Sequence, residues 1–277
     1  MEHTEGTFQG TRGLEIYYQT WLPEGDPKAA IIIVHGLGEH SGRYDNVVDH
    51  MVPLGYAVYG FDLPGHGKSD GTREFVEQFK DYSDTLTTYR KMVEGWQSGK
   101  PIFLLGHSMG GLITTQYLIG HSKDFSGAVI SAPAITVPEN ITQMTITLGK
   151  LFSKIAPKLG VMALDANMIS KDPAVVEKYV HDPLVFHDKT TARLSAELLK
   201  AMMQVDQDME KITVPMVIVQ GSEDKLANPQ GAKTLYAQAG SMDKTLKIYD
   251  GLFHEVFNEP EKALVLSEVA SWLEAHV

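Results

Sequence analysis

PIFLLGHSMGGLITTQYLI, residues 101 to 119, is the stretch of sequence that decides the fold. Residues 102–105 are all apolar and predict a strand covered on both faces. The next five residues, GHSMG, match the pattern G-x-S-x-G, and residues 112–119 predict a helix. A serine on such a sharp turn is held in a strained conformation, and its glycine neighbours avoid collisions with adjacent strands. This order of strand, pattern and helix predicts a nucleophilic Ser108, with an ordinary glycine-rich turn as the alternative.

Further buried strands are predicted on both sides of this segment. The apolar runs that predict them are Ala29 to Val34, Tyr56 to Phe61, Ala128 to Ile130 and Pro215 to Val219. Leu14 to Leu22 is rich in aromatic and β-branched residues and predicts a strand near the start of the sheet. Helical periodicity lies between strands, most clearly from Phe75 to Trp96. The alternation predicts a doubly wound, mostly parallel sheet whose sites form at the carboxyl ends of its strands.

The alternation of strand and helix is interrupted between residues 133 and 205. Helical signals follow one another there, and one apolar stripe has helical spacing. Its members are Ile141, Met144, Leu148, Leu151, Phe152 and Ile155. The stripe either packs on the core or roofs a lipid-binding cleft, in which case Ile141, Met144 and Leu148 contact substrate. We predict a core domain, residues 1–132 and 206–277, with a helical cap inserted at residues 133–205.

A nucleophilic serine requires a base within hydrogen-bond reach and a carboxylate that orients the base. In the α/β-hydrolase fold these partners follow the serine in the order Asp or Glu, then His, each after a later strand. The strand predicted at residues 214–221 is followed by Asp224, and that at residues 245–249 by His254. Glu223 adjoins Asp224 but is better explained as a solvated neighbour. We therefore predict an α/β-hydrolase with the catalytic triad Ser108, Asp224 and His254.

The tetrahedral intermediate of acyl transfer requires two backbone N–H donors for its oxyanion. One donor is expected from Met109, directly after the nucleophile and at the positive end of the following helix. The other is expected from the loop HGLG at residues 35–38, where we choose Leu37. The glycines of this loop are also explained by a tight turn alone.

Composition excludes several classes of function. The formal net charge of −11 and the pI near 5.4 disfavour attraction to nucleic-acid phosphates, so no nucleic-acid partner is expected. Cysteine is absent, which removes disulfides, thiolate metal sites and cysteine nucleophiles. The His-Asp pairs at residues 181–182 and 187–188 lack a third ligand at zinc-like spacing, so we predict no metal. Residues 1–13 hold no secretory apolar region, which predicts a cytoplasmic protein.

Five segments together resemble the monoacylglycerol lipases. They are HGLGEHSGRY at 35–44, DLPGHG at 62–67, GHSMGG at 106–111, SKDPAVVEKYVHDPL at 170–184 and GLFHEVFNEPE at 251–261. The resemblance implies a cofactor-free enzyme, cytosolic or membrane-peripheral, that hydrolyses monoacylglycerols through an acyl-enzyme. It also implies that Glu39, Arg43 and Tyr179 build the polar pocket for the glycerol end. Animal members carry a second histidine where this chain has Phe257, whereas bacterial members are similar to this chain in reading HEVFNEPE.

Three alternatives stay open at this point. The first is a broader carboxylesterase or a lysophospholipase, which would use the same triad on other acyl esters. A non-catalytic ligand-binding receptor on this fold is disfavoured, because binding alone needs no activated serine. Finally, Glu39 and Arg43, four residues apart, form either part of the substrate pocket or a local ion pair that anchors the loop. The expected partner is a small lipid ester, with transient membrane contact through the cap.

Overall fold

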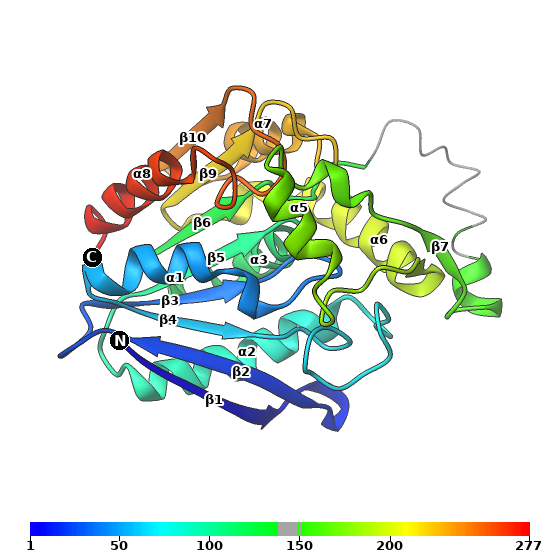
Figure 1. Ribbon diagram of the computed structural model, residues 1–277, viewed down its shortest axis with the longest axis horizontal. Coiled ribbons are helices and arrows are strands. Elements are labelled where there is room, and N and C mark those ends of the chain that lie inside the picture. Colours follow the sequence, from blue (N-terminus) through cyan, green and yellow to red (C-terminus); the bar gives the residue numbers. More distant parts are fainter. Residues whose placement is uncertain (138–148, 150) are drawn as a thin grey trace.

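The structure, a computed structural model, describes residues 1–137, 149 and 151–277 (Figure 1). Its centre is an eight-stranded sheet in the order β1-β2-β4-β3-β5-β6-β9-β10. The strands are β1 (Glu2–Gln9), β2 (Glu15–Leu22), β3 (Ala29–Val34), β4 (Tyr56–Phe61), β5 (Ile102–His107), β6 (Gly127–Ser131), β9 (Met216–Gly221) and β10 (Lys244–Tyr249). β2 runs antiparallel to β1 and β4, and the other pairs are parallel. The predicted mostly parallel sheet is therefore confirmed.

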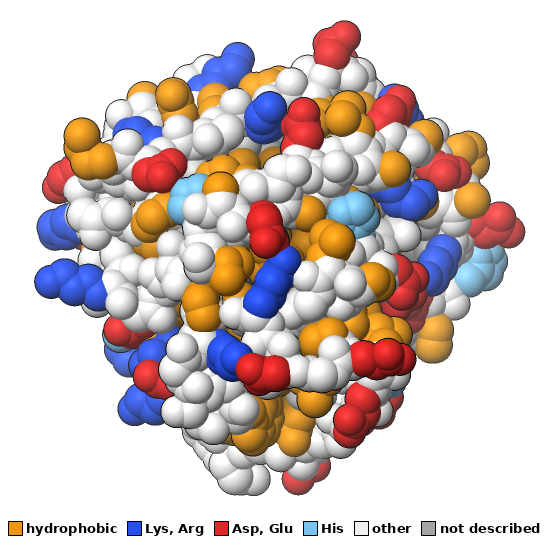
Figure 2. All heavy atoms as spheres, turned by 90° about the vertical axis from the view of Figure 1, so that its left-hand side faces the viewer, with side chains coloured by type: hydrophobic (Ala, Val, Ile, Leu, Met, Phe, Trp, Pro, Cys, Tyr) orange, Lys and Arg blue, Asp and Glu red, His pale blue; other side chains and the backbone are white. Residues whose placement is uncertain are grey.

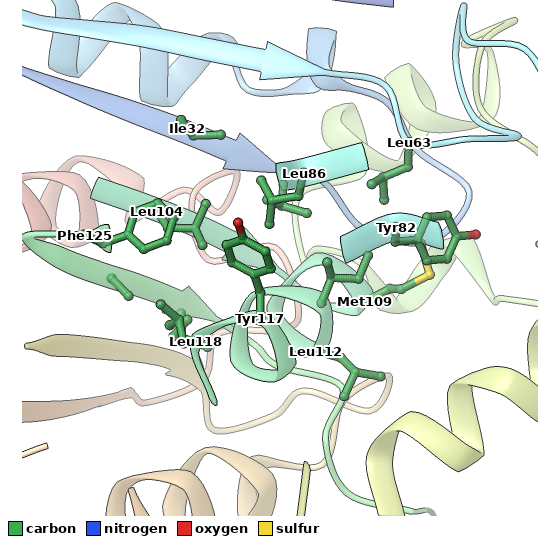
Figure 3. Close-up of a cluster of buried hydrophobic side chains, with 14 of the residues drawn as sticks. Ile32, Leu63, Tyr82, Leu86, Leu104, Met109, Leu112, Tyr117, Leu118 and Phe125 are labelled. Carbon is green, nitrogen blue, oxygen red and sulfur yellow. The ribbon is translucent and has the colours of Figure 1, made fainter. Parts of the chain in front are cut away.

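Helices cover both faces of this sheet. α1 (Asp45–Met51) and α8 (Lys262–Glu274) pack on one face, and α2 (Lys80–Trp96), α3 (Met109–His121), α6 (Ala192–Asp208) and α7 (Pro229–Gln238) on the other. Strand β3 explains the two layers, because all six of its residues are fully buried and alternate between the two cores. Figure 3 shows Ile32 of β3 in one core with Leu86 of α2 and Leu112 of α3.

Two features of the fold differ from the expectation. Strand β1 was not predicted, since its residues EHTEGTFQ are mostly exposed and carry no apolar face. Only Phe8 is buried there, stacked on Tyr89 at 5.3 Å between ring centroids. The helix expected from Phe75 begins at Lys80, with Phe79 as its N-cap residue. The apolar spacing continued into the preceding turn, so periodicity alone placed the helix start too early.

Within the predicted cap, the described residues form helices and a small two-stranded sheet. α5 (Pro173–Val180) is followed by β8 (Thr190–Thr191), which pairs antiparallel with β7 (Gly160–Met162), and residues 151–155 are helical. Strands of three and two residues were too short to predict from sequence. Helix α6 runs through the predicted boundary at residue 205 and joins the core cluster. Ile141, Met144 and Leu148 lie outside the described residues.

The described residues of the predicted cap lie at the carboxyl ends of the parallel strands, on the right of Figure 1. Figure 2 shows the opposite side, where acidic and basic side chains are interspersed among apolar ones. Short 3-10 helices complete the connections, at Thr11–Gly13, Ser41–Arg43, Val52–Leu54, Ser122–Asp124, Ala166–Met168 and Met209–Lys211. Within the described ranges, every helix is too short or too polar to cross a bilayer.

Candidate active site

Ser108 occupies the turn between β5 and α3 and has an unusual backbone conformation. Its φ is 55° and its ψ is −118°, a strained geometry for a residue with a side chain. A Cβ at Gly106 would lie 2.3 Å from Thr114 Oγ1, and one at Gly110 would lie 2.0 Å from the Val34 carbonyl oxygen. Only glycine fits at these two positions. The sequence GHSMG thus forms the sharp strand-to-helix turn that the pattern predicts.

Asp224 and His254 meet at the ends of β9 and β10. Asp224 Oδ2 lies 2.7 Å from His254 Nδ1, and the two side chains are 0% and 4% exposed. The other carboxylate oxygen accepts the backbone N–H groups of Leu226 and Ala227 at 2.8 and 2.9 Å. Because an ionised carboxylate only accepts hydrogen bonds, the His254 proton lies on Nδ1. Nε2 is left free to accept the proton of Ser108.

Ser108 and His254 line one small cavity of about 10 Å³. Leu37, Leu164, Ile169 and other residues complete its wall. Ser108 and His254 are both described by the structure, and no hydrogen bond joins the Ser108 hydroxyl to the His254 ring. Such bonds are often long without substrate and tighten in the Michaelis complex. A cavity of this volume accommodates roughly one water molecule.

The electrostatics favour His254 over its neighbour His107 as the base. Burial alone would lower the pKa of His254, but the charge and hydrogen bond of Asp224 raise it above its usual value. Burial would raise the pKa of Asp224, yet His254 and two backbone N–H groups hold it below its usual value. His107 lacks such a partner, and burial lowers its pKa to about 3. His107 therefore stays neutral, while His254 is poised to take up a proton.

We expect kcat/KM to rise with pH as His254 loses its proton. The imidazole accepts a proton from Ser108 only when neutral, so activity falls as pH drops through the folded pKa. That pKa is raised, which places the midpoint above the value of about 6.5 for a free histidine. The profile is measured with a soluble p-nitrophenyl ester, with circular dichroism at each pH as the control for folding. A midpoint well below about 6 in a folded protein contradicts this assignment.

The loop after β3 packs directly against the nucleophile. A Cβ at Gly36 would lie 3.2 Å from Ser108 Cβ, and the Gly36 N–H donates to Glu39 Oε1 at 2.6 Å. Since the Gly36 donor is already occupied, the next N–H, that of Leu37, is the candidate for the oxyanion. Met109 is the first residue of α3, where a helix leaves its N–H groups without internal partners. These positions support the predicted pair of donors, which stays a prediction.

Glu39, Arg43 and Tyr179 lie together beside Ser108. Arg43 Nη1 donates to Glu39 Oε2 at 2.8 Å, and the Arg43 Cζ atom lies 4.6 Å from the centre of the Tyr179 ring. All three side chains line the cavity that holds Ser108. The ion pair considered from sequence is thus present. The Glu39 carboxylate also accepts a hydrogen bond from the Gly36 N–H, so it anchors the loop at residues 35–38.

Glu255 belongs to this cluster and was not predicted. Its two oxygens accept from Nη1 and Nη2 of Arg43 at 2.7 and 2.8 Å, a bidentate pair. Asn258 donates to the same carboxylate at 2.8 Å. The sequence signal was its position directly after His254 in a segment that resembles the lipases. Only the folded loop shows that this side chain turns toward Arg43.

The residues that the structure describes contain no group of three or more His, Cys, Asp or Glu placed to hold a metal ion. The pairs at residues 181–182 and 187–188 are used in other contacts. The Asp182 carboxylate forms a hydrogen bond with His40 Nε2 at 2.9 Å, and His187 Nε2 lies 3.3 Å from the Asp182 carbonyl oxygen.

The chain is similar in sequence to known lipases over almost its whole length. The family described as "Serine aminopeptidase, S33" matches residues 25–261. A monoacylglycerol lipase of Mycolicibacterium smegmatis is 35% identical over 99% of this chain and 98% of its own. The monoglyceride lipase of Homo sapiens is 34% identical over 94% of this chain and 87% of its own.

Solved structures agree with the sequence comparison. The crystal structure of a monoacylglycerol lipase of Paleococcus ferrophilus superposes with a TM-score of 0.84 at 30% identity, covering 100% of both chains. Family, fold and site geometry therefore point the same way. This chain belongs to the monoacylglycerol lipase family of α/β-hydrolases.

Proposed function

We propose that this protein hydrolyses monoacylglycerols to a fatty acid and glycerol, with Ser108 as nucleophile, His254 as base and Asp224 as the orienting carboxylate. The observation that carries the proposal is the buried Asp224 to His254 hydrogen bond of 2.7 Å at the wall of the cavity that contains Ser108. The names and overall similarity of the relatives support the choice of a monoacylglycerol as substrate.

The reaction proceeds in two acyl transfers. His254 Nε2 takes the Ser108 proton as the serine oxygen attacks the ester carbonyl carbon. The resulting oxyanion accepts hydrogen bonds from the Leu37 and Met109 N–H groups. Collapse breaks the bond to glycerol, which leaves with the proton from His254. Water then attacks the acyl-enzyme with the same base, releasing the fatty acid and restoring Ser108.

The cavity has a polar wall and an apolar wall, which fit the two different ends of a monoacylglycerol. We place the glycerol end against Glu39, Arg43 and Tyr179, because these side chains line the cavity beside Ser108. The acyl chain then lies toward Leu164 and Ile169, which belong to the cap predicted at residues 133–205. Cap and core contribute to one site, and that supports treating the cap as an insertion into a single α/β domain.

Hydrolysis of monooleoylglycerol compared with p-nitrophenyl butyrate and lysophosphatidylcholine tests the proposed function. We expect the highest kcat/KM on monooleoylglycerol. Preference for the short ester would indicate a broader carboxylesterase, and preference for the phospholipid would indicate a lysophospholipase. No turnover of any ester would favour a ligand-binding receptor.

We further propose that the cap docks transiently on a lipid surface. Within residues 151–162 of the predicted cap, six large apolar side chains are exposed by 42% to 73%: Leu151, Phe152, Ile155, Leu159, Val161 and Met162. Such a concentration marks an interaction surface, and a lipase draws its substrate from an interface. A cytoplasmic location stays a prediction.

Replacing Ile155 and Leu159 together with serine should lower the rate on vesicle-borne monooleoylglycerol several-fold, by about 3- to 10-fold, through the loss of apolar contact with lipid. The rate on soluble p-nitrophenyl butyrate should stay within about twofold, since the triad is untouched. The matched control replaces Leu54 and Leu264, which are 46% and 55% exposed outside the cap. An equal fall on both substrates, or the same effect in the control, speaks against docking.

A further inference from the structure

The cavity beside Ser108 carries more negative than positive charge. Among the described residues that line it, Arg43 supplies the single guanidinium or ammonium group, whereas Glu39 and Glu255 supply two carboxylates. The two histidines of the cavity leave this balance unchanged before reaction: burial lowers the pKa of His107 to about 3, and His254 acts as a base only in its neutral form. The wall that faces the leaving group therefore holds one carboxylate in excess of its cation.

The charge of Arg43 is directed toward these carboxylates. Nη1 donates to both Glu39 and Glu255, and Nη2 donates to Glu255. The ring of Tyr179 covers the guanidinium at 4.6 Å, and the side chain of Arg43 is only 7% exposed. A guanidinium held in a bidentate pair and a second ion pair has little attraction left for another anion.

The negative charge of Glu255 is not needed to neutralise Arg43. Glu39 alone would neutralise Arg43, and burying a second carboxylate carries a desolvation penalty. Burial would raise the pKa of Glu255, but Arg43 and the Asn258 amide hold it below its usual value, so the carboxylate is ionised at neutral pH. A charge kept in the site at this energetic cost suggests a role in selecting substrate.

We propose that Glu255 is a specificity-determining residue that makes the leaving-group pocket accept esters of uncharged alcohols and reject esters whose alcohol carries an anionic group. The proposal rests on the proposed function, because it concerns the alcohol that leaves from Ser108. An anionic leaving group would enter a poorly solvated pocket beside two like charges whose cation is already engaged. Rejection by like charge is a common means of specificity.

Three esters with one acyl chain separate charge from size in the wild-type protein. They are 1-lauroylglycerol, 1-lauroylglycerol 3-phosphate, and the dimethyl phosphotriester of the latter, which is uncharged and larger. We expect kcat/KM on the anionic phosphate to be lower than on 1-lauroylglycerol by about a hundredfold or more. The neutral triester should be cleaved at least about tenfold faster than the phosphate despite its size.

Glu255→Gln tests the residue itself, because it removes the charge and keeps the shape. The ratio of kcat/KM between 1-lauroylglycerol and its phosphate should fall by about tenfold or more, chiefly through a gain on the phosphate. The matched control is Glu223→Gln, which removes the same charge from an exposed carboxylate near the same end of the sheet. In that variant the ratio should stay within about twofold.

Each outcome decides the matter. No cleavage of 1-lauroylglycerol by the wild type overturns the proposed function. Cleavage of 1-lauroylglycerol and its phosphate at equal rates leaves that function standing and overturns the role of charge, as does equal rejection of the phosphate and the triester. An unchanged ratio in folded Glu255→Gln, or an equal change in Glu223→Gln, overturns the role of Glu255. If Glu255→Gln does not fold, the same ratio is measured in Glu255→Ala, and an unchanged ratio there overturns the role of Glu255.

Discussion

Ser108→Ala is expected to lower kcat on a monoacylglycerol by about four to six decades, because members of a catalytic triad act as a unit. The variant keeps its fold, since the change removes one oxygen at the mouth of a cavity and leaves the glycines of the strand-to-helix turn in place. The residual rate comes from the oxyanion donors and from substrate binding. The measurement is kcat on monooleoylglycerol, with the melting temperature as the control for folding.

Contamination by another esterase is the main hazard of that measurement. The purified variant must therefore also fail to react with a fluorophosphonate probe that labels the wild type. A folded Ser108→Ala protein that retains even about a tenth of the wild-type rate contradicts the assignment of the nucleophile.

Asp224→Asn is expected to lower kcat by about four decades, because the side chain that orients His254 becomes partly a donor and favours the wrong tautomer. The loss of the carboxylate also removes the group that raises the pKa of His254. The remaining activity should therefore rise with pH at a lower midpoint than in the wild type. A structural role alone would not shift this midpoint.

The matched control is Asp250→Asn, which changes an exposed carboxylate at the end of β10. We expect that variant to keep its activity within about twofold, as surface changes away from a site do. A loss of similar size in both variants, or an unchanged midpoint in Asp224→Asn, would show that Asp224 does not act on His254.

The core of the fold was accessible to sequence, and a triad could be predicted, because local signals and chain order coincide there. Strand β3 lies where its apolar run predicts it, since a strand buried on both faces is apolar throughout. The predicted triad follows from three strand ends and a known order of residue types. Strand β1 had no such signal, because an exposed edge strand needs no apolar alternation.

The polar cluster shows where sequence reasoning stops. Glu39 and Arg43 are four residues apart, a spacing that indicates a possible ion pair, and the structure contains this ion pair. Glu255 lies 212 positions from Arg43, and no local pattern links two loops so distant in sequence. Their contact depends on how the loops after β3 and β10 meet above the sheet. A bidentate pair of this kind requires the three-dimensional structure.

Site-specific labelling tests the central claim most directly. The protein is incubated with a fluorophosphonate probe, and peptide mass spectrometry locates the adduct while monooleoylglycerol hydrolysis is followed in parallel. We predict one adduct per chain, on Ser108, formed at the same rate as activity is lost. An adduct on another residue, or hydrolysis that persists after Ser108 is fully labelled, would contradict the account.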